Sequence, residues 1–235
     1  MIIRPTNGVE NTALTYFFVN GDDEVLTPSG SDCTFPDLGN GGGNTITAIS
    51  CPSQNKQGAA YYKYGSQSWK IVSFGLEKST GFAFNPGTGS FTIDFWMFTL
   101  PGTLLSGYTN AYFYKDANNS LDVIDYVNED IILTSNGISM TIASGIIYTP
   151  YSTWRHCALV REAGDTYDTD LYKYYEDGVL QDTANWDSGD FSTAKSIDLT
   201  GEFHLYGNRL YIDEFRVTTG RALWNTDFTP PNRGS

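Results

Sequence analysis

The sequence is poor in basic residues and rich in acidic ones. Lysine and arginine together number 14 among 235 residues, against 27 aspartates and glutamates, which gives a formal net charge of −13. Binding to nucleic acid phosphates requires clustered Lys and Arg, and here these residues are spread along the chain. We therefore expect neither nucleic acid nor an anionic membrane as a partner.

Long apolar runs are also missing. No stretch approaches the ~20 consecutive apolar residues of a membrane-spanning helix. Met1-Ile2-Ile3 is followed at once by Arg4-Pro5, with no apolar segment of a secretory signal behind it. We therefore expect the chain to be made and folded in a cytoplasm. Amphipathic helical patterns are absent too, since apolar residues never recur at i, i+3, i+4 and i+7 over three turns.

Cysteine and histidine are scarce. The three cysteines are Cys33, Cys51 and Cys157, and none has the spacing of zinc ligands. Cys33 and Cys51 would be able to pair in an oxidising medium, but an odd count in a reducing compartment favours free thiols. His156 and His204 are the only histidines, which excludes a metal site built from several of them.

Aromatic residues and glycine are abundant. The chain has 16 Tyr, 14 Phe, 5 Trp and 24 Gly, a composition that favours strands joined by tight turns. From about residue 46 onward, segments with strand-like alternation recur between Gly, Asn, Asp and Pro turns. The clearest of them cover 91–98, 131–135, 138–143, 154–161, 171–176, 203–206 and 210–217.

Two of these connections are typical hairpin turns. Asn136-Gly137 and Asp177-Gly178 each join a pair of expected strands through two residues. Short strands at this spacing predict an all-β fold, a two-sheet antiparallel jelly-roll sandwich over residues 46–235. Phe95 and Trp154 are expected to anchor its inner face.

Residues 1–45 have a different character. They carry several turn signals and the glycine-rich run 39–43, and only 14–19 has a strand-like pattern. We interpret them as an extended N-terminal arm, or an irregular extension, that leads into the sandwich.

Three ordered groups of residues carry a resemblance to a known family. They are Gly-Ser-Phe-Thr-Ile-Asp-Phe-Trp at 89–96; Trp-Arg-His-Cys-Ala-Leu-Val-Arg at 154–161 with Tyr-Glu-Asp-Gly at 175–178; and Tyr-Ile-Asp-Glu-Phe-Arg-Val at 211–217 with Gly-Arg-Ala-Leu-Trp at 220–224 and Phe-Thr-Pro-Pro at 228–231. In this order they resemble laminin-G-type, concanavalin-A-like lectin-glucanase domains of bacterial and bacteriophage proteins. The closing segment is especially similar to copies in tailed-bacteriophage virion proteins.

This resemblance implies a jelly-roll sandwich whose relatives bind glycans or proteins. It implies a non-catalytic virion structural protein, located in the virion as a head decoration or a tail-fibre or receptor-binding part. The N-terminal arm would bind other virion proteins, a host-surface glycan is a candidate ligand, and a homo-oligomer is a candidate state. The alternatives are a cellular glycan-binding module and, less favoured, a glycoside hydrolase.

Asp94 and Trp96 are predicted to bind a ligand. They share a strand face with Phe98, and an aromatic ring beside a carboxylate is typical of a sugar cleft. Glycosidases of related folds alternate acids along one strand, as Glu-x-Asp-x-Glu, and no such motif occurs here. Asp213 and Glu214 are adjacent, so alternation places them on opposite faces. We therefore predict that the protein is not an enzyme.

Tyr172 and Tyr174 are predicted to bind a ligand as well. They share a strand face, and further tyrosines cluster at Tyr61, Tyr62, Tyr64, Tyr112 and Tyr114. Exposed tyrosines suit sugar stacking and protein interfaces. Strand propensity alone would also supply many of them.

His156 and Asp213 are interpreted as structural residues. His156 is expected to be a core histidine with one satisfied hydrogen bond. Asp213 is expected to share a face with Tyr211, Phe215 and Val217 and, as a buried carboxylate, to accept hydrogen bonds from backbone N–H groups or from His156.

An acidic loop offers the one candidate metal site. Asp165, Asp168 and Asp170 lie between two expected strands, and oxygen-rich loops of this kind bind calcium in some related sandwiches. Their spacing does not match an EF-hand, so a solvated hairpin loop is the favoured alternative. No other cofactor is expected.

Overall fold

The fold is seen in a computed structural model. It describes the backbone of residues 15–19, 27–29, 32–36, 45–48, 56–58, 61–64, 67–71, 76–87, 89–99, 111–116, 119–125, 130–135, 137–145, 152–163, 171–185, 197–207 and 210–232. Side chains are described at 61–64, 68, 89–98, 130–134, 137, 139–145, 152–163, 171–184 and 211–232. Across these ranges no helix is long and apolar enough to cross a membrane.

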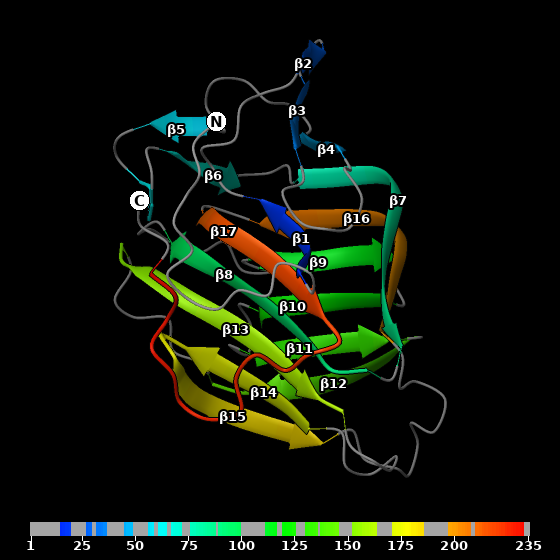
Figure 1. Ribbon diagram of the computed structural model, residues 1–235, viewed down its shortest axis with the longest axis vertical. Coiled ribbons are helices and arrows are strands. Elements are labelled where there is room, and N and C mark those ends of the chain that lie inside the picture. The colour runs from blue at the N-terminus through cyan, green and yellow to red at the C-terminus, as the bar shows by residue number, and fades with distance from the viewer. Residues whose placement is uncertain are drawn as a thin grey trace.

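The described residues form strands in two sheets (Figure 1). The first sheet has eight strands, namely β15 (Val179–Asn185), β14 (Leu171–Glu176), β13 (Trp154–Glu162), β8 (Phe91–Thr99), β17 (Leu210–Thr219), β6 (Gln67–Ile71) and β5 (Lys56–Gly58) in that order, with β1 (Thr15–Val19) paired to β17. The second has nine, in the order β12 (Ile138–Ala143), β11 (Asp130–Ser135), β10 (Asn119–Asp125), β9 (Ala111–Asp116), β16 (Ile197–Gly207), β7 (Leu76–Gly87), β4 (Thr45–Ala48), β3 (Asp32–Pro36) and β2 (Thr27–Ser29).

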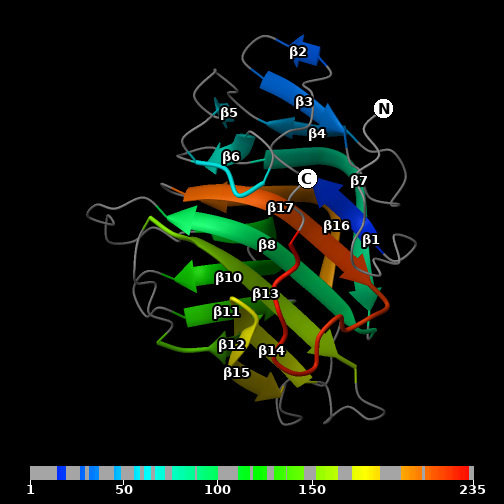
Figure 2. The same cartoon turned by 60° about the vertical axis from the view of Figure 1, so that its left-hand side comes forward.

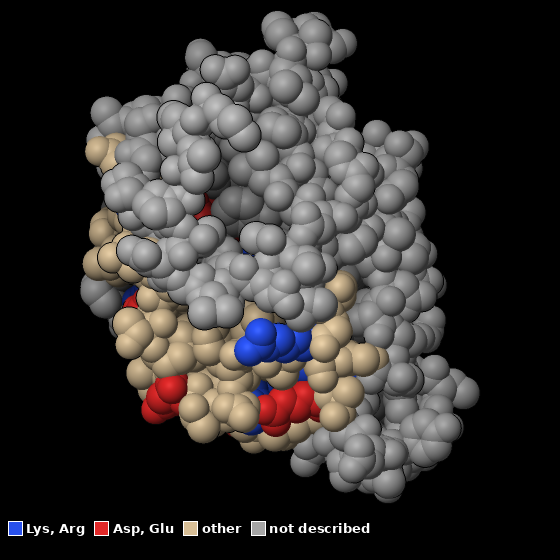
Figure 3. All heavy atoms as spheres, in the orientation of Figure 1, with Lys and Arg blue, Asp and Glu red and all other residues tan. Residues whose placement is uncertain are grey.

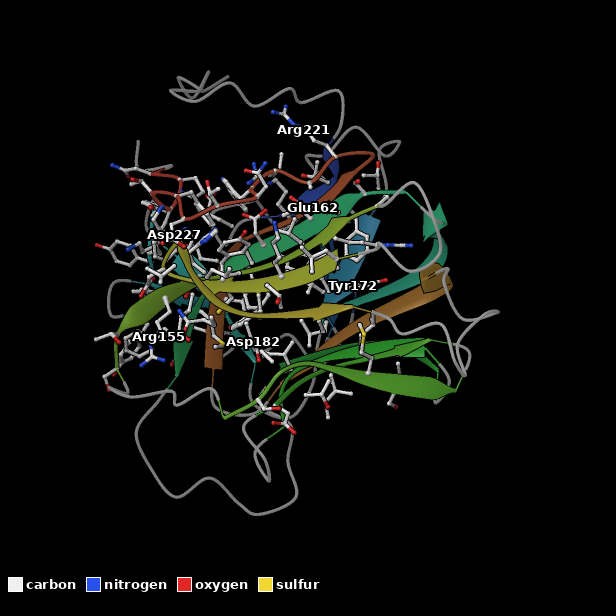
Figure 4. All side chains as sticks on the ribbon, turned by 90° about the horizontal axis from the view of Figure 1, so that it is seen from below. Arg155, Glu162, Tyr172, Asp182, Arg221 and Asp227 are labelled. Carbon is white, nitrogen blue, oxygen red and sulfur yellow. The ribbon has the colours of Figure 1, made fainter. Side chains whose placement is uncertain are left out.

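Every strand pairing in the described ranges is antiparallel, and none of these ranges forms a helix. The two sheets lie as separate layers when the molecule is seen from below (Figure 4). The all-β antiparallel sandwich expected from the sequence is therefore confirmed. The jelly-roll strand order stays a prediction.

The inner face of the first sheet is built by strict alternation along β8. Phe91, Ile93, Phe95 and Met97 are at most 3% exposed, and the Phe95 ring lies 6.0 Å from that of Phe215 on β17. Successive residues of a strand point to opposite faces, so Thr92, Asp94, Trp96 and Phe98 belong to the outer face.

Both expected hairpins are present. Gly137 separates β11 from β12 with φ 78°, and Asp177 and Gly178 separate β14 from β15 with φ 48° and 80°. Positive φ at both central residues is the geometry that matches a two-residue turn to the twist of its strands. Aspartate followed by glycine tolerates it well, which is why the sequence marks this turn.

Strands from the first 45 residues join both sheets. The expected strand over 14–19 is present as β1, which pairs with β17 from Thr15↔Thr218 to Val19↔Phe215. In the second sheet β2 pairs with β3, and β3 pairs with β4. The division of the chain into an arm and a sandwich at residue 45 stays a prediction.

The outer face of the first sheet is covered by the strap, the name used here for residues 220–232. The strap follows β17 and runs as a coil across β8, β13 and β14 (Figures 1 and 2). Ala222, Trp224 and Phe228 of the strap pack against Ala158, Val160 and Tyr175 of the sheet, all three of which are fully buried. Both faces of the central strands are thus inside the protein.

Candidate functional site

Asp94, His156 and Arg216 form a buried polar cluster on the outer face of the first sheet. They meet because β8 lies between β13 and β17, with His156 opposite Trp96 and Arg216 opposite Asp94. Arg216 Nε donates to Asp94 Oδ2 at 2.8 Å and Arg216 Nη2 donates to Oδ1 at 3.1 Å. His156 Nε2 lies 3.2 Å from the same Oδ1. Each side chain is at most 5% exposed, so the carboxylate is fully committed to partners inside the protein.

A β-bulge in β17 places Arg216 in this cluster. The register with β8 shifts between Asp213 and Arg216, and Glu214 takes a φ of 53°. One extra residue in the strand exchanges the faces of everything beyond it. The expectation that Asp213 and Phe215 share a face was therefore wrong, because Asp213 lies on the outer face and Phe215 on the inner.

Asp213 binds backbone N–H groups, as the sequence predicted. Its Oδ2 accepts from Lys63 N at 3.2 Å and from Tyr64 N at 3.1 Å, and its Oδ1 accepts from Glu214 N at 2.9 Å. Because these bonds satisfy a carboxylate that is 1% exposed, Asp213 fastens the segment 61–64 to β17.

His156 is the core histidine that the sequence predicted. It is completely buried, and among the residues that the structure describes only Nε2 of its two ring nitrogens has a hydrogen-bond partner. The remaining surroundings are aromatic, with the rings of Trp96, Trp224 and Phe228 at 5.2, 5.6 and 5.7 Å between centroids. The strap therefore closes over the imidazole.

Trp96 lies beside Asp94 on the outer face, as expected, and is also covered. Lys63 Nζ is 3.7 Å from the centroid of its ring and Tyr64 meets it edge-on at 5.8 Å, which leaves Trp96 6% exposed. Burial lowers the pKa of Lys63. The ligand-binding role of Asp94 and Trp96 stays a prediction, and both would need the covering segments to move before a ligand reached them.

Tyr172 and Tyr174 share one face of β14, as the sequence predicted, and that face is the inner one. Each is 1% exposed. Tyr172, labelled in Figure 4, packs edge-on against Phe91 with 6.4 Å between ring centroids, and the Arg161 guanidinium lies 5.6 Å from the centroid of its ring. In this position they are part of the core, and their ligand-binding role stays a prediction.

Asp165, Asp168 and Asp170 lie outside the described residues, so the calcium prediction is untested. Within the described ranges no three His, Cys, Asp or Glu side chains come together as metal ligands would. Cys157 is fully buried on the inner face. Burial, and to a smaller extent the charge of Glu176, raises the pKa of its thiol. A thiol held neutral in this way is not a nucleophile.

The covering role of the strap and the pairing of Arg216 with Asp94 were not predicted from the sequence. A signal for the strap was present in 91–98, where Trp96 and Phe98 give β8 a second apolar face that something must cover. The salt-bridge partner of Asp94 could not be found, because alternation without a bulge puts Arg216 on the other face of β17.

Comparison with known proteins identifies the fold and no family. No family model matches the sequence, and no curated protein matches it. Among solved structures, domain 4 of the extracellular arabinanase AbnA from Geobacillus stearothermophilus, solved in complex with arabinotriose, is similar with a TM-score of 0.58 at 18% identity. The match covers 88% of this chain and 93% of that domain.

Two further structures match a part of a longer chain. The binding domain of botulinum neurotoxin DC, solved in complex with rat synaptotagmin II, has a TM-score of 0.57 at 15% identity over 92% of this chain and 50% of its own. A sialidase from Trypanosoma rangeli has a TM-score of 0.51 at 11% identity over 95% of this chain and 34% of its own. The protein thus spans about half the length of the toxin chain and about one third of the sialidase chain, and the likeness to both is one of fold.

Proposed function

We propose that the protein is a non-catalytic glycan-binding module. The observation that carries the proposal is the end-to-end match with the arabinanase domain, which is a separate domain of an enzyme and was solved with an oligosaccharide. The match covers 88% of this chain and 93% of that domain, so the two share one sandwich fold over nearly their whole matched length.

The buried cluster supports binding over catalysis. Glycoside cleavage needs two carboxyl groups that reach one cleft, one of them with a raised pKa. Asp94 is 1% exposed and paired with Arg216, and Asp213 is 1% exposed and bonded to backbone N–H groups. Neither carboxylate is available to a substrate, so the cluster serves to hold the strap on the sheet.

Incubation with a panel of neutral and acidic polysaccharides tests both parts of this proposal. We expect retarded migration in affinity electrophoresis with at least one polysaccharide and no new reducing ends. Release of oligosaccharide that disappears in Asp94→Asn would overturn the non-catalytic part. Absence of retardation across the panel would overturn the glycan-binding part.

A second proposal places this module on a bacteriophage particle. It is supported by the similarity of 220–224 and 228–231 to the closing segment of virion copies, and in this protein those residues are the strap that packs on the sheet. The N-terminal residues would then bind other virion proteins, and the sandwich would face a host glycan. Fixed copy number in purified particles is the expected result, and a chain found only in host cell fractions would contradict it.

A further inference from the structure

Lys63 holds an ammonium group over the outer face of the first sheet. Its Nζ is 3.7 Å from the centroid of the Trp96 ring, and the side chain is half-buried. Within the part of the chain that the structure describes, Nζ makes no hydrogen bond and no salt bridge. An ammonium has three N–H donors, and a half-buried one keeps only a part of its water. Lys63 is therefore able to donate to an oxygen atom of a ligand.

Asp177 supplies a carboxylate near this ammonium. Its Oδ1 accepts from His156 N at 2.9 Å and its N donates to His156 O at 2.8 Å, so the turn residue is fixed against β13. His156 is paired with Trp96, with 5.2 Å between the ring centroids. Burial lowers the pKa of Lys63 and the charge of Asp177 partly opposes this effect, as expected for two groups on neighbouring strands. A donor and an acceptor thus stand close together.

Two half-buried aromatic rings lie beside this pair of charges. Trp154 and Tyr61 both pack on Phe98, with 5.5 and 4.9 Å between ring centroids. Phe98 follows Trp96 by two residues on the same face of β8, which separates the two positions by about 7 Å. The end of β8 and the start of β13, which carry these rings, lie side by side (Figure 1). Aromatic surface and charged groups therefore meet at one end of the outer face.

The side chains at this end of the sheet reach solvent. Tyr62, next to Lys63, is 40% exposed, and Asp177 and Thr153 are exposed as well. The strap comes to its end here, since Pro231 O accepts a hydrogen bond from Tyr64 Oη at 3.0 Å. A ligand would therefore be able to reach the end of the outer face without displacing the strap.

The charge of the protein decides which glycan fits. The chain carries a formal net charge of −13, and a surface of that sign repels an anionic polymer. On the described part of the face seen in Figure 3, basic side chains form only small separate patches and no continuous basic surface. A hydroxyl group accepts a hydrogen bond from an ammonium and donates one to a carboxylate, and Lys63 and Asp177 present these two groups. An uncharged sugar is therefore favoured over an acidic one.

We propose that Tyr61, Lys63, Trp154 and Asp177, together called the end site, bind an uncharged polysaccharide. Lys63 donates a hydrogen bond to a sugar hydroxyl and Asp177 accepts one, while the rings of Trp154 and Tyr61 pack on the apolar face of a sugar. The proposal rests on the glycan-binding function and assigns it a place and a ligand class.

The experiment measures the affinity of the full chain for neutral and uronate-containing polysaccharides by affinity electrophoresis. Wild-type protein is expected to bind a neutral polysaccharide and to leave the uronate polymers unbound. Asp177→Asn keeps an oxygen for His156 N and tolerates the φ of 48°, so the turn should persist. It should weaken binding about fivefold, because a charged acceptor becomes a neutral one.

Asp182→Asn is the matched control for this change. Asp182 is an exposed carboxylate of the same hairpin, and its Oδ1 likewise accepts a backbone N–H, that of Thr183 at 2.8 Å. It stands four residues beyond Gly178, about 13 Å along the strand. The substitution removes the same charge away from the end site and should leave the affinity unchanged.

Lys63→Met keeps an apolar side chain over Trp96 and removes the ammonium. It should weaken binding about tenfold, the usual effect of losing one hydrogen bond to a charged group. Arg221→Met is its control, because it removes one positive charge from an exposed position of the strap and should change nothing. Trp154→Ala should also weaken binding about tenfold, and Trp154→Phe, which keeps a ring, should stay within about threefold of wild type.

The outcomes separate the site from the function. Wild-type binding that Lys63→Met and Asp177→Asn leave unchanged, or that their controls weaken equally, would overturn the end site while the glycan-binding function stands. Absence of binding to every polysaccharide would overturn the function itself. Selective binding of uronate polymers would overturn the ligand class.

A second measurement requires no variant. Lysines of the wild-type protein are acetylated with an amine-selective ester, with and without the neutral polysaccharide, and read by peptide mass spectrometry. Acetylation of Lys63 should slow about fivefold when the polysaccharide is at about four times its Kd. Lys173, which is bound to Glu162 Oε2 and to Asn225 O at 2.9 Å each, should react at the same rate in both samples. Equal acetylation of Lys63 with and without bound polysaccharide would contradict the end site, even if the variants proved unable to fold.

Discussion

Trp224 and Phe228 stack face to face in the strap, with ring centroids 4.0 Å apart and planes 5° apart, and both rings stand perpendicular to the buried imidazole of His156. Two residues of a coil thus complete the environment of a histidine in the middle of a sheet. Phe228 N of the strap donates a hydrogen bond to Gly178 O at 2.8 Å, and Asn225 O of the strap accepts one from Lys173 Nζ at 2.9 Å. These contacts explain how a segment without regular structure covers a sheet face.

Truncation of the stack should loosen the strap. We expect Trp224→Ala to lower the free energy of unfolding by about 2 kcal/mol, less than the 3–5 kcal/mol of a fully buried aromatic because Trp224 is only partly buried. Urea denaturation measures it. Thr226→Ala, at an exposed position of the same strap, is the control and should change stability by less than about 0.5 kcal/mol. Equal losses in both variants would show that the stack does not hold the strap.

A single methyl group at Gly178 should displace the strap. A Cβ there would lie 1.9 Å from the carbonyl oxygen of Phe228, and the φ of 80° is already unfavourable for a residue with a side chain. Gly178→Ala is therefore expected to cost more than the ~1–2 kcal/mol of the left-handed conformation alone, and to expose the strap to limited proteolysis.

Gly220 provides the matched control. It has a similar φ of 75°, but a Cβ there would meet nothing within 4 Å. Gly220→Ala should therefore show only the conformational cost, with the strap as resistant to proteases as in wild type. If the two variants are equally destabilised, the close approach of Phe228 to the turn is not what requires glycine at 178.

The turn at 177–178 was predictable from the sequence, whereas the outer face of the first sheet was not. Asp-Gly between two strand-like segments has a local cause, the positive φ that those residues accept, and short-range patterns show it. The bulge at Glu214 has no such cause in sequence, since no glycine marks it, yet it exchanges the faces of Phe215 and Arg216. Asp94 looked like a residue of an open cleft because the strap that covers it is distant in sequence and irregular.

Removal of one partner from the buried ion pair should be costly. Arg216→Met keeps the length of the side chain and removes both guanidinium hydrogen bonds from the buried Asp94 carboxylate, which keeps His156 Nε2 at 3.2 Å. We expect a loss of about 3–5 kcal/mol in the free energy of unfolding, measured in urea, because the buried carboxylate loses the opposite charge of its guanidinium partner. The double variant Asp94→Asn with Arg216→Met removes that charge and should recover a part of the loss. A double variant that is less stable than Arg216→Met would contradict this account.

The two faces of the first sheet should respond differently to aromatic truncation. Phe95 is 2% exposed in the interior, and Phe95→Ala should cost about 3–5 kcal/mol. The sequence-based expectation that Trp154 is also an inner anchor was wrong. Trp154 pairs with Phe98 on the outer face, 5.5 Å between ring centroids, and is only partly buried. Trp154→Ala should therefore cost clearly less than Phe95→Ala, and an equal or larger loss would show that the faces are misassigned.

Stability should fall at alkaline pH through Tyr175. Its hydroxyl is buried beneath Phe228 and has no hydrogen-bond partner among the described residues. Burial, and to a smaller extent the charges of Glu162 and Asp227, raises the pKa of Tyr175 from 10.0 to about 12. Burial also raises the pKa of Tyr211 in the same sense. Because the folded-state pKa lies above the unfolded one, the contribution of each group is complete below about pH 10 and declines at higher pH; that of Tyr175 is lost as the pH rises towards about 12. The free energy of unfolding, measured in urea, should therefore decline between about pH 9.5 and about pH 11, on either side of the ordinary tyrosine pKa of about 10.

Tyr175→Phe separates this residue from the other titrating groups. The substitution removes a hydroxyl that makes no hydrogen bond to the part of the chain that the structure describes, and it keeps the ring that packs on Phe228 at 5.3 Å. Stability at pH 8 should therefore stay within about 1 kcal/mol of wild type. The decline above pH 10 should become shallower and should not vanish, since Tyr211 still titrates. An identical decline in Tyr175→Phe and wild type would mean that the phenol reaches solvent, and hence that the strap does not seal this end of the sheet.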